Sequence, residues 1–195
     1  MAFMKVELEK IFSFIIELEK LKSVNRMTKV IGTDRRENSA EHSWQIAVLA
    51  MSLEGYAKEK VDINRVVRML LLHDVVEIDA GDKFIFSAAH ADTENEMKAA
   101  ERIFGMLPPQ VGDEFKALWL EYEERRTPES RYAYAMDRLM PVLINLNNGC
   151  QSWVENGVRL EQVLSKTGIL ADFNAELWEM ISRRLYESRQ MGFLG

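Results

Sequence analysis

The chain has few of the residues that mark secreted or membrane proteins. A single cysteine, Cys150, occurs among 195 residues, so no internal disulfide can form. No apolar stretch approaches the roughly 20 residues that a membrane-spanning helix needs. The N-terminus begins MAFMKVELEK and lacks the charged and apolar regions of a signal peptide. We therefore expect a reduced, cytoplasmic protein that does not enter a membrane.

An excess of positive charge is also absent. Lys and Arg number 25 against 31 Asp and Glu, which gives a formal net charge of −6. Proteins that bind polymeric nucleic acid normally present a basic surface, so this balance argues against such a partner. With 47% hydrophobic and 29% charged residues, the composition is that of a globular protein. Because no linker or repeat interrupts the chain, we expect one domain over residues 1–195.

Apolar residues recur at spacings of three and four almost throughout, which predicts an all-α fold, a single compact bundle of about eight helices. Six are expected at about residues 6–22, 41–58, 62–78, 111–125, 156–166 and 174–190, and two more begin near Thr93 and Thr127. Residues 23–40 are polar and predict a loop long enough to be functional. The 62–78 helix, which Asp62 can cap, is apolar nearly all round and should be central and buried.

The least expected residues of that helix are His73 and Asp74, which lie within the apolar run 70–76. Ionisable groups are unfavourable in an apolar helix unless they pair or bind a metal. Imidazole nitrogen and carboxylate oxygen suit a divalent transition metal ion. Glu77 follows four residues after His73, on the same side of the expected helix. The alternative is a hydrogen-bonded structural pair, and the spacing does not decide between the two.

Other residues add candidates around this pair. His42 opens the 41–58 helix, whereas His90 has no partner spacing and is predicted to be a surface residue. Pro141 cannot donate a hydrogen bond to the carbonyl of Asp137, so it either opens the backbone there or only bends the helix around the core. A substrate phosphate would need positive charge, and the candidates are Arg26, Arg35, Arg36, Lys83 and Arg138.

Three stretches of the sequence together resemble the HD-domain metal-dependent phosphohydrolases, and among them the bacterial 5′-deoxynucleotidase type. The stretches are RENSAEHSW at 36–44, LLHDVVEIDAGD at 71–82 and AMDRL at 135–139. With the order of the helices, the resemblance covers about residues 18–184, which would form the core around the metal site. It implies one divalent ion (Co, Mn, Mg, Fe, Ni or Zn) with four protein ligands: His42, His73, Asp74 and Asp137.

The resemblance also implies roles for residues near the ion. Glu77 would take part in acid–base chemistry, and Asp82 would bind substrate or orient water. Arg26 would reach the phosphate, with Lys83 as a further candidate. The family commonly has a tryptophan directly or soon after this arginine, but Met27 follows here, so the sugar preference is left open.

The predicted function is hydrolysis of (deoxy)nucleoside 5′-monophosphates to nucleoside and phosphate by a divalent-metal-dependent phosphomonoesterase. One alternative keeps the site but acts on a phosphodiester or polyphosphate nucleotide. Another is a non-enzymatic HD module that binds a nucleotide or a protein. The apolar faces of the first and last helices could support a homodimer or serve a monomer's core. The first of these faces consists of Ile11, Phe12, Ile15, Ile16 and Leu18.

Overall fold

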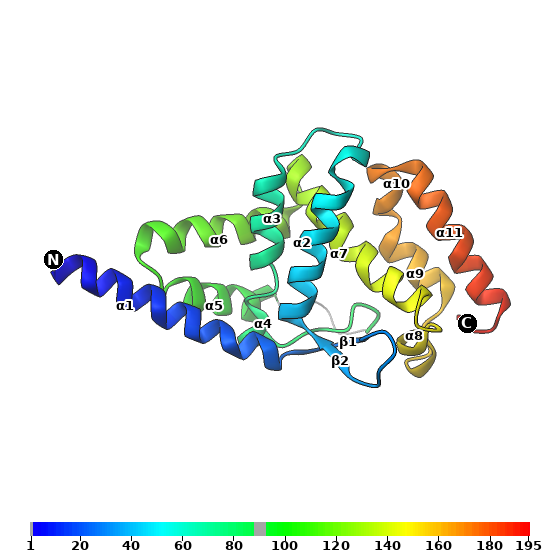
Figure 1. The fold of residues 1–195 in the computed structure, drawn as a ribbon, viewed down its shortest axis with the longest axis horizontal. Helices are drawn as coiled ribbons and strands as arrows, with labels where there is room; N and C mark the ends of the chain where they lie inside the picture. The colour runs from blue at the N-terminus through cyan, green and yellow to red at the C-terminus, as the bar shows by residue number, and fades with distance from the viewer. Residues whose placement is uncertain (1, 88–92) are drawn as a thin grey trace.

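The computed structural model describes residues 2–87 and 93–195, which form a helical fold with one small sheet (Figure 1). The all-α prediction is confirmed, since the only sheet in these ranges is the antiparallel pair of β1 and β2. No helix there is long and apolar enough to span a membrane. His90 lies outside the described residues. In chain order the elements are α1 (Ala2–Glu17), η1 (Leu18–Ser23), β1 (Asn25–Lys29), β2 (Arg36–Asn38), α2 (Ser39–Leu53), η2 (Glu54–Tyr56), α3 (Ile63–Leu72), α4 (Glu77–Ala80), α5 (Thr93–Phe104), α6 (Pro109–Glu124), α7 (Pro128–Leu146), α8 (Gln151–Glu155), α9 (Leu160–Thr167), α10 (Ile169–Phe173) and α11 (Ala175–Gln190).

Residues 25–38 of the segment 23–40 form a β-hairpin, so the prediction of a loop was wrong. Strand β1 pairs with β2 in a register that places Asn25 opposite Asn38 and Lys29 opposite Arg36. Gly32, with φ of +77°, allows the turn between the strands. Asn38 then caps α2 by accepting a hydrogen bond from the backbone N–H of Glu41. The hairpin therefore leads directly into the helix that carries His42.

The expected 62–78 helix ends at Leu72, which corrects the predicted boundary. Asp62 caps α3 as expected. Nδ1 of His73 lies 2.8 Å from the carbonyl oxygen of Leu70, which in a continuing α-helix would accept the N–H of Asp74. The next turn is tighter, because the N–H of Glu77 donates to the carbonyl of Asp74, three residues earlier. The His73 imidazole thus occupies the Leu70 carbonyl that would accept the next helical hydrogen bond. The helix therefore ends just before His73, the residue that faces the site.

Helix α7 lies at the centre of the fold, in contact with α2, α3 and α6 (Figure 1). Thr127 caps its start and Pro141 lies inside it, as the sequence predicted. Asp137, in the middle of α7, is 2% exposed and lies one turn before Pro141. The inner faces of α2 and α3 supply the neighbouring core through Ile46, Ala50, Val66, Met69 and Leu70.

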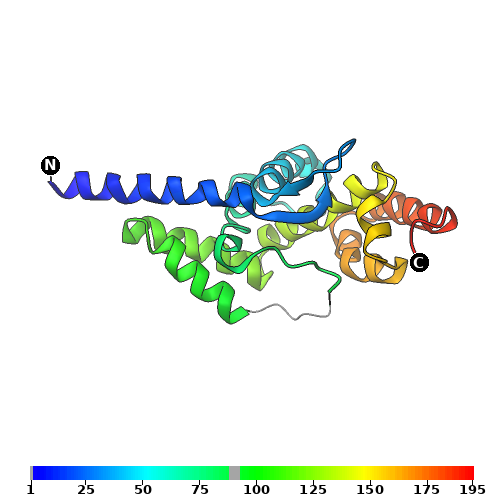
Figure 2. The same ribbon diagram turned by 90° about the horizontal axis from the view of Figure 1, so that it is seen from below.

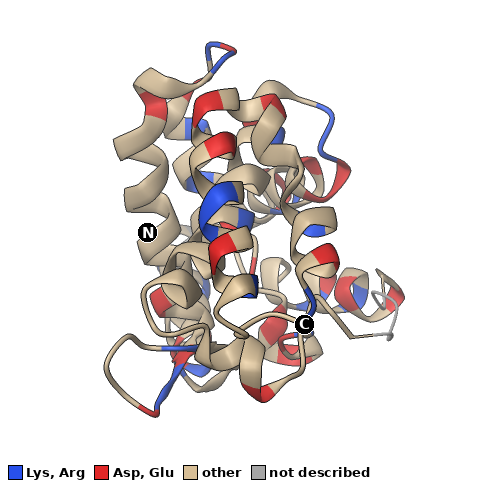
Figure 3. Ribbon diagram, turned by 90° about the vertical axis from the view of Figure 1, so that its right-hand side faces the viewer, with Lys and Arg blue, Asp and Glu red and all other residues tan. Residues whose placement is uncertain are grey.

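The apolar face of the first helix, for which the sequence left a dimer contact and a monomer's core as alternatives, is largely on the outside. Phe12, Ile15 and Ile16 are exposed, and the residues that pack inward near them are Phe14 and Leu21. Figures 1 and 2 show α1 extending away from the main body toward its N-terminus. An apolar stripe of α2 is exposed as well, at Trp44, Val48 and Met51. Lys and Arg are interspersed with Asp and Glu along the helices seen in Figure 3.

Candidate metal centre and active site

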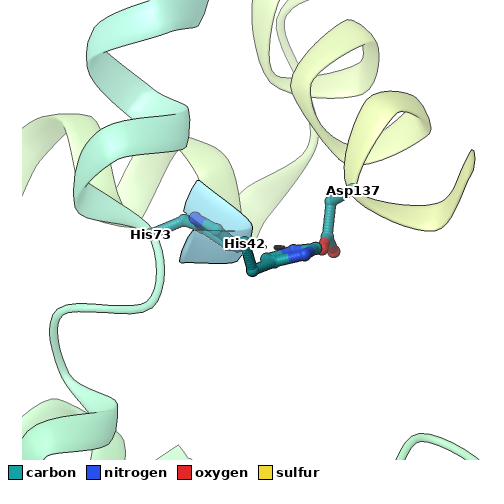
Figure 4. Close-up of side chains that lie close together, drawn as sticks. All are labelled: His42, His73 and Asp137. Atoms are coloured by element: carbon teal, nitrogen blue, oxygen red, sulfur yellow. Dashed lines mark hydrogen bonds and ion pairs between the residues drawn. The ribbon is translucent and has the colours of Figure 1, made fainter. Parts of the chain in front are cut away.

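Three of the four predicted metal ligands lie together in the interior. His42 comes from α2, His73 from the end of α3 and Asp137 from α7, and Figure 4 shows them converging. One ligand atom from each can be chosen so that all lie within 4.8 Å of one another. Nε2 of His42 is 2.8 Å from Oδ1 of Asp137, and Nε2 of His73 is 3.7 Å from the same oxygen. Three helices thus present nitrogen and oxygen donors to one point.

The backbone fixes which nitrogen of His73 faces the cluster. A carbonyl oxygen only accepts, so Nδ1 must carry the hydrogen that it donates to Leu70. Nε2 is then the ligand atom of the neutral ring. It is buried and makes no well-aligned hydrogen bond among the described residues, although carboxylate oxygens of Asp74 and Asp137 lie 2.9 and 3.7 Å away. Two imidazoles and a carboxylate, with one nitrogen free of a well-aligned hydrogen bond, match the donor set of a divalent transition metal. The residues present therefore fit the ion.

Asp74, the fourth predicted ligand, lies at the edge of this group. Its Oδ1 is 2.9 Å from Nε2 of His73, and its Oδ2 accepts a hydrogen bond from Nη1 of Arg26 at 2.7 Å. Burial would raise the pKa of Asp74, but His73 and Arg26 outweigh it and lower the pKa to about 2. Asp74 is therefore an ionised carboxylate beside the cluster, which suits a ligand.

The two histidines differ in protonation. Burial, aided by the charge of Arg26, lowers the pKa of His42 to about 4, so this ring is neutral. Burial also acts to lower the pKa of His73, but Asp74 and Asp137 outweigh it and raise the value to about 10. His73 thus carries a proton at neutral pH when no metal is bound. A metal ion, which needs neutral imidazole, must displace that proton.

Glu77 has the properties of a proton-transfer group. Its Oε2 accepts a hydrogen bond of 2.6 Å from the hydroxyl of Ser39. Burial, together with the charge of Asp74, raises the pKa of Glu77 to about 8. A carboxyl group that titrates near neutral pH can both give and take a proton. Burial also raises the pKa of Asp82, whose Oδ1 lies 3.6 Å from Nη1 of Arg26.

A cavity of about 460 Å³ opens onto this cluster. Of the five candidate cations, Arg26, Lys83 and Arg138 line it; Arg138 is paired with Asp137 and Lys83 with Glu96. Arg35 and Arg36 are exposed and are not among the described residues that line the cavity. His42 lies behind the wall, whereas the other predicted site residues reach the cavity: His73, Asp74, Glu77, Asp82 and Asp137.

Several residues of the site were not predicted from the sequence. Tyr122 donates a hydrogen bond of 2.9 Å to Oδ2 of Asp137, and Ser39 holds Glu77. Trp153 is buried in the core and also lines the cavity. Ser39 has a weak sequence signal, because it lies three residues before His42 on the same helix face. Tyr122 and Trp153 have none, since only the tertiary fold brings them to the site.

The fold and the cluster together define a class of helical protein in which histidines and an aspartate from separate helices form a divalent metal site. A profile described as the HD domain matches residues 18–178, and the chain belongs to the HD-domain family. As the sequence resemblance predicted, it is a hydrolase of the metal-dependent phosphohydrolase kind.

Named relatives and solved structures agree with this family. A 5′-deoxynucleotidase HDDC2 from Xenopus laevis is 26% identical over 88% of this chain and 87% of its own length. A 5′-deoxynucleotidase from Yersinia pestis (strain Pestoides F) is 28% identical over 78% and 83%. A solved structure from Magnetospirillum magnetotacticum MS-1, titled a "predicted metal-dependent phosphohydrolase", matches with a TM-score of 0.94 and 43% identity over 99% of this chain and 98% of that one.

Proposed function

We propose that the protein is a phosphomonoesterase that releases inorganic phosphate from (deoxy)nucleoside 5′-monophosphates. The observation that carries this proposal is that a guanidinium, a proton-transfer carboxyl and the ligand cluster border one cavity, through Arg26, Glu77 and His73. The printed names of the Xenopus and Yersinia relatives support the substrate class. The cavity, at about 460 Å³, is within the range typical of small-molecule sites.

The proposed metal ligands are His42, His73, Asp74 and Asp137. A bound divalent ion would activate water and polarise the phosphoryl group. Arg26 binds the phosphate, because its guanidinium lines the cavity and can form paired hydrogen bonds to two phosphate oxygens. Lys83 adds positive charge on the same wall, and Asp82 orients the attacking water or the substrate.

Glu77 moves the proton that the reaction requires. Water forms a new bond to phosphorus and gives up a proton, while the bond between phosphorus and the 5′-oxygen breaks and that oxygen gains a proton. Glu77 gives its proton to the leaving oxygen and regains one from the water, so the two transfers balance. Ser39 donates to Oε2 of Glu77, so Oε1 is the oxygen left to carry the proton. The pKa of about 8 keeps a large fraction of Glu77 protonated at neutral pH, which suits donation to the leaving oxygen.

The sugar is proposed to lie near Met27, which lines the cavity beside Arg26. Methionine is unbranched and adapts its shape to what it contacts. We therefore expect little discrimination between ribose and deoxyribose. Comparing kcat/KM for matched ribo- and deoxyribonucleotides tests this expectation, and a strong preference for one sugar would contradict it.

The activity is tested by removing metal with a chelator and then supplying Co²⁺, Mn²⁺, Mg²⁺, Fe²⁺, Ni²⁺ or Zn²⁺ with a panel of nucleotides. Phosphate should be released from 5′-monophosphates with at least one ion. If none supports release, the proposal is wrong. If only cyclic or polyphosphate nucleotides react, the site is a phosphohydrolase of another substrate class.

Glu77→Gln separates proton transfer from metal binding. It preserves the shape of the side chain and removes the titrating group, so kcat should fall by about 10² to 10⁴ while metal binding persists. His73→Ala and Asp137→Ala should instead lose the ion, as measured by metal content after dialysis. Full activity in the Glu77 variant would exclude the proposed role.

The proposal also includes a cytoplasmic location, suited to a nucleotide substrate, and a homodimer as the assembled form. The exposed apolar side chains of α1 and α2 support the dimer. Burying them against a second copy would remove apolar surface from water.

A further inference from the structure

A buried carboxylate next to the metal cluster has no role in the chemistry above. Glu37, on β2, is only 3% exposed. Its Oε1 lies 3.4 Å from Nε of Arg26 and 3.7 Å from Nδ1 of His42. All three atoms are buried and lack a hydrogen-bond partner in the described ranges. Two side-chain nitrogens thus face one oxygen, and none of the three atoms has another partner in the described ranges.

The hairpin explains why these groups meet. Arg26 follows Asn25 on β1 and Glu37 precedes Asn38 on β2, and Asn25 and Asn38 are directly paired. Asn38 is also the N-cap of α2. The strand pairing therefore fixes Glu37 relative to Arg26, and the cap fixes it relative to His42. The hairpin and the cap of α2 therefore hold the proposed metal ligand His42 and the proposed phosphate-binding residue Arg26 against the same carboxylate.

The nitrogen of His42 that faces Glu37 is the one that a bound metal would not use. Nε2 points to Oδ1 of Asp137 inside the cluster, so Nδ1 points away from it. Histidines that bind metals almost always donate their other ring N–H to a carboxylate, a backbone carbonyl or water. His73 already does so through Leu70. Glu37 is the corresponding acceptor for His42, and movements well below 1 Å bring its two contacts to the usual range of about 2.7–3.2 Å.

We propose that Glu37 is a positioning residue that accepts the Nδ1–H of His42 and the Nε–H of Arg26. It selects the tautomer of His42 in which Nε2 is the metal ligand, and it orients the guanidinium toward the phosphate. Glu37 is not among the described residues that line the cavity, so it acts through its two neighbours and does not touch the substrate. The inference rests on the proposed metal centre and on the proposed phosphate contact of Arg26.

The test compares Glu37→Gln with a matched control. Glutamine keeps the shape and loses the charge. Glu155→Gln makes the same change at a carboxylate that also pairs with a cation of β1, since Oε1 of Glu155 is 2.6 Å from Nζ of Lys29. By calorimetry, the affinity for Co²⁺ should fall about 10- to 100-fold in the Glu37 variant and stay within about twofold of the parent in the control. Parental affinity in the Glu37 variant would overturn the proposal.

A spectroscopic measurement distinguishes positioning from a general loss of structure. In the protein loaded with Zn²⁺, the Nδ1–H of His42 should give a downfield proton resonance. That resonance should move upfield or disappear in Glu37→Gln, while the resonance of His73 stays in place. If both change equally, or neither changes, Glu37 does not act through His42.

Kinetics complete the test and keep it separate from the proposed function. Through Arg26, the Glu37 variant should raise KM for nucleotide at saturating metal, whereas Glu155→Gln should not. An unchanged KM would remove the Arg26 part of the proposal. If the parent binds metal and shows the His42 resonance but hydrolyses no nucleotide, the proposed function fails and the role of Glu37 toward the metal ligand stands.

Discussion

At the scale of single residues, His73 performs two tasks with its two nitrogens. Nδ1 donates a hydrogen bond to the carbonyl oxygen of Leu70, which a continuing helix would use, so α3 ends there. Nε2 faces Asp137. The side chain that is proposed to bind the metal therefore also shapes the backbone that presents it. A substitution at His73 therefore changes the local fold as well as the ligand set.

The buried ionisable groups predict an unusual pH dependence of stability. In the metal-free protein, the pKa of His73 is raised to about 10 and that of Glu77 to about 8. Between pH 6.5 and 8 the folded state holds protons on both groups that the unfolded state has largely released. His42, whose pKa is lowered to about 4, acts in the opposite direction near pH 6.5, but the two retained protons outweigh it, so stability falls as pH rises. The slope is up to about 1.4 kcal/mol per pH unit for each retained proton.

Thermal melts of chelated protein from pH 6.5 to 8 measure this slope. Glu77→Gln should make it shallower, because one of the retained protons is gone. Saturating Mn²⁺ should also reduce it, since the ion replaces the proton on His73. A melting temperature that is constant or rises over this interval would contradict the assigned protonation.

The sequence predicted site residues where their chemistry conflicts with their surroundings. His73 and Asp74 were visible as ionisable groups in an apolar run, and the family resemblance added His42 and Asp137. Glu37 and Tyr122 were not visible, because their importance depends on contacts made across the fold. The chemistry of a single residue can therefore indicate a candidate ligand in the sequence. A residue that orients a ligand can be recognised only from its contacts in the tertiary structure.

At the scale of elements, the sequence pattern predicted the helices, but it did not predict the β-hairpin or the early end of α3. The hairpin was missed because strands of five and three residues contain too few alternations to show a period of two. The end of α3 was missed because a side chain, and not a proline or glycine, takes the backbone acceptor. Both the hairpin and the end of α3 lie at the site, and functional sites are where local secondary-structure propensity is most often overridden.

The packing of α6 against the end of α5 gives an element-scale prediction. A Cβ added at Gly112 would lie 2.4 Å from the carbonyl oxygen of Phe104, which is backbone and cannot move aside easily. Gly112→Ala should therefore destabilise the protein by about 1–3 kcal/mol. Gly55→Ala, where nothing lies within 4 Å, is the control and should be neutral or slightly stabilising. Equal midpoints for both variants in urea unfolding would show that α6 can shift freely.

At the scale of the whole molecule, the exposed apolar surface predicts association. Met4, Leu8, Phe12 and Ile15 follow one another at spacings of three and four along the outside of α1. Figure 2 shows α1 and α2 on the same side of the molecule, and α2 carries the exposed residues Trp44, Val48 and Met51. Light scattering should report a dimer for the parent protein.

Variants on the two terminal helices test which face is used. Ile15→Glu should shift the protein toward monomer, because a charge would be buried in the interface. Met180→Glu is the matched change on α11, at a methionine that is 54% exposed, and should leave the dimer intact. A monomeric parent protein, or a loss of dimer only in the Met180 variant, would exclude this interface.

The ligand cluster has one more consequence, for the lifetime of the chain. His42 and Asp137 are 95 residues apart, and an ion held between them and His73 would tie α2, α3 and α7 to one another. Binding to the folded state alone raises stability in proportion to the logarithm of metal concentration. When a cell is short of metal, the protein would be less stable and would unfold more often, so proteases would degrade it faster. Metal supply would set how much of this protein persists as well as how fast it works.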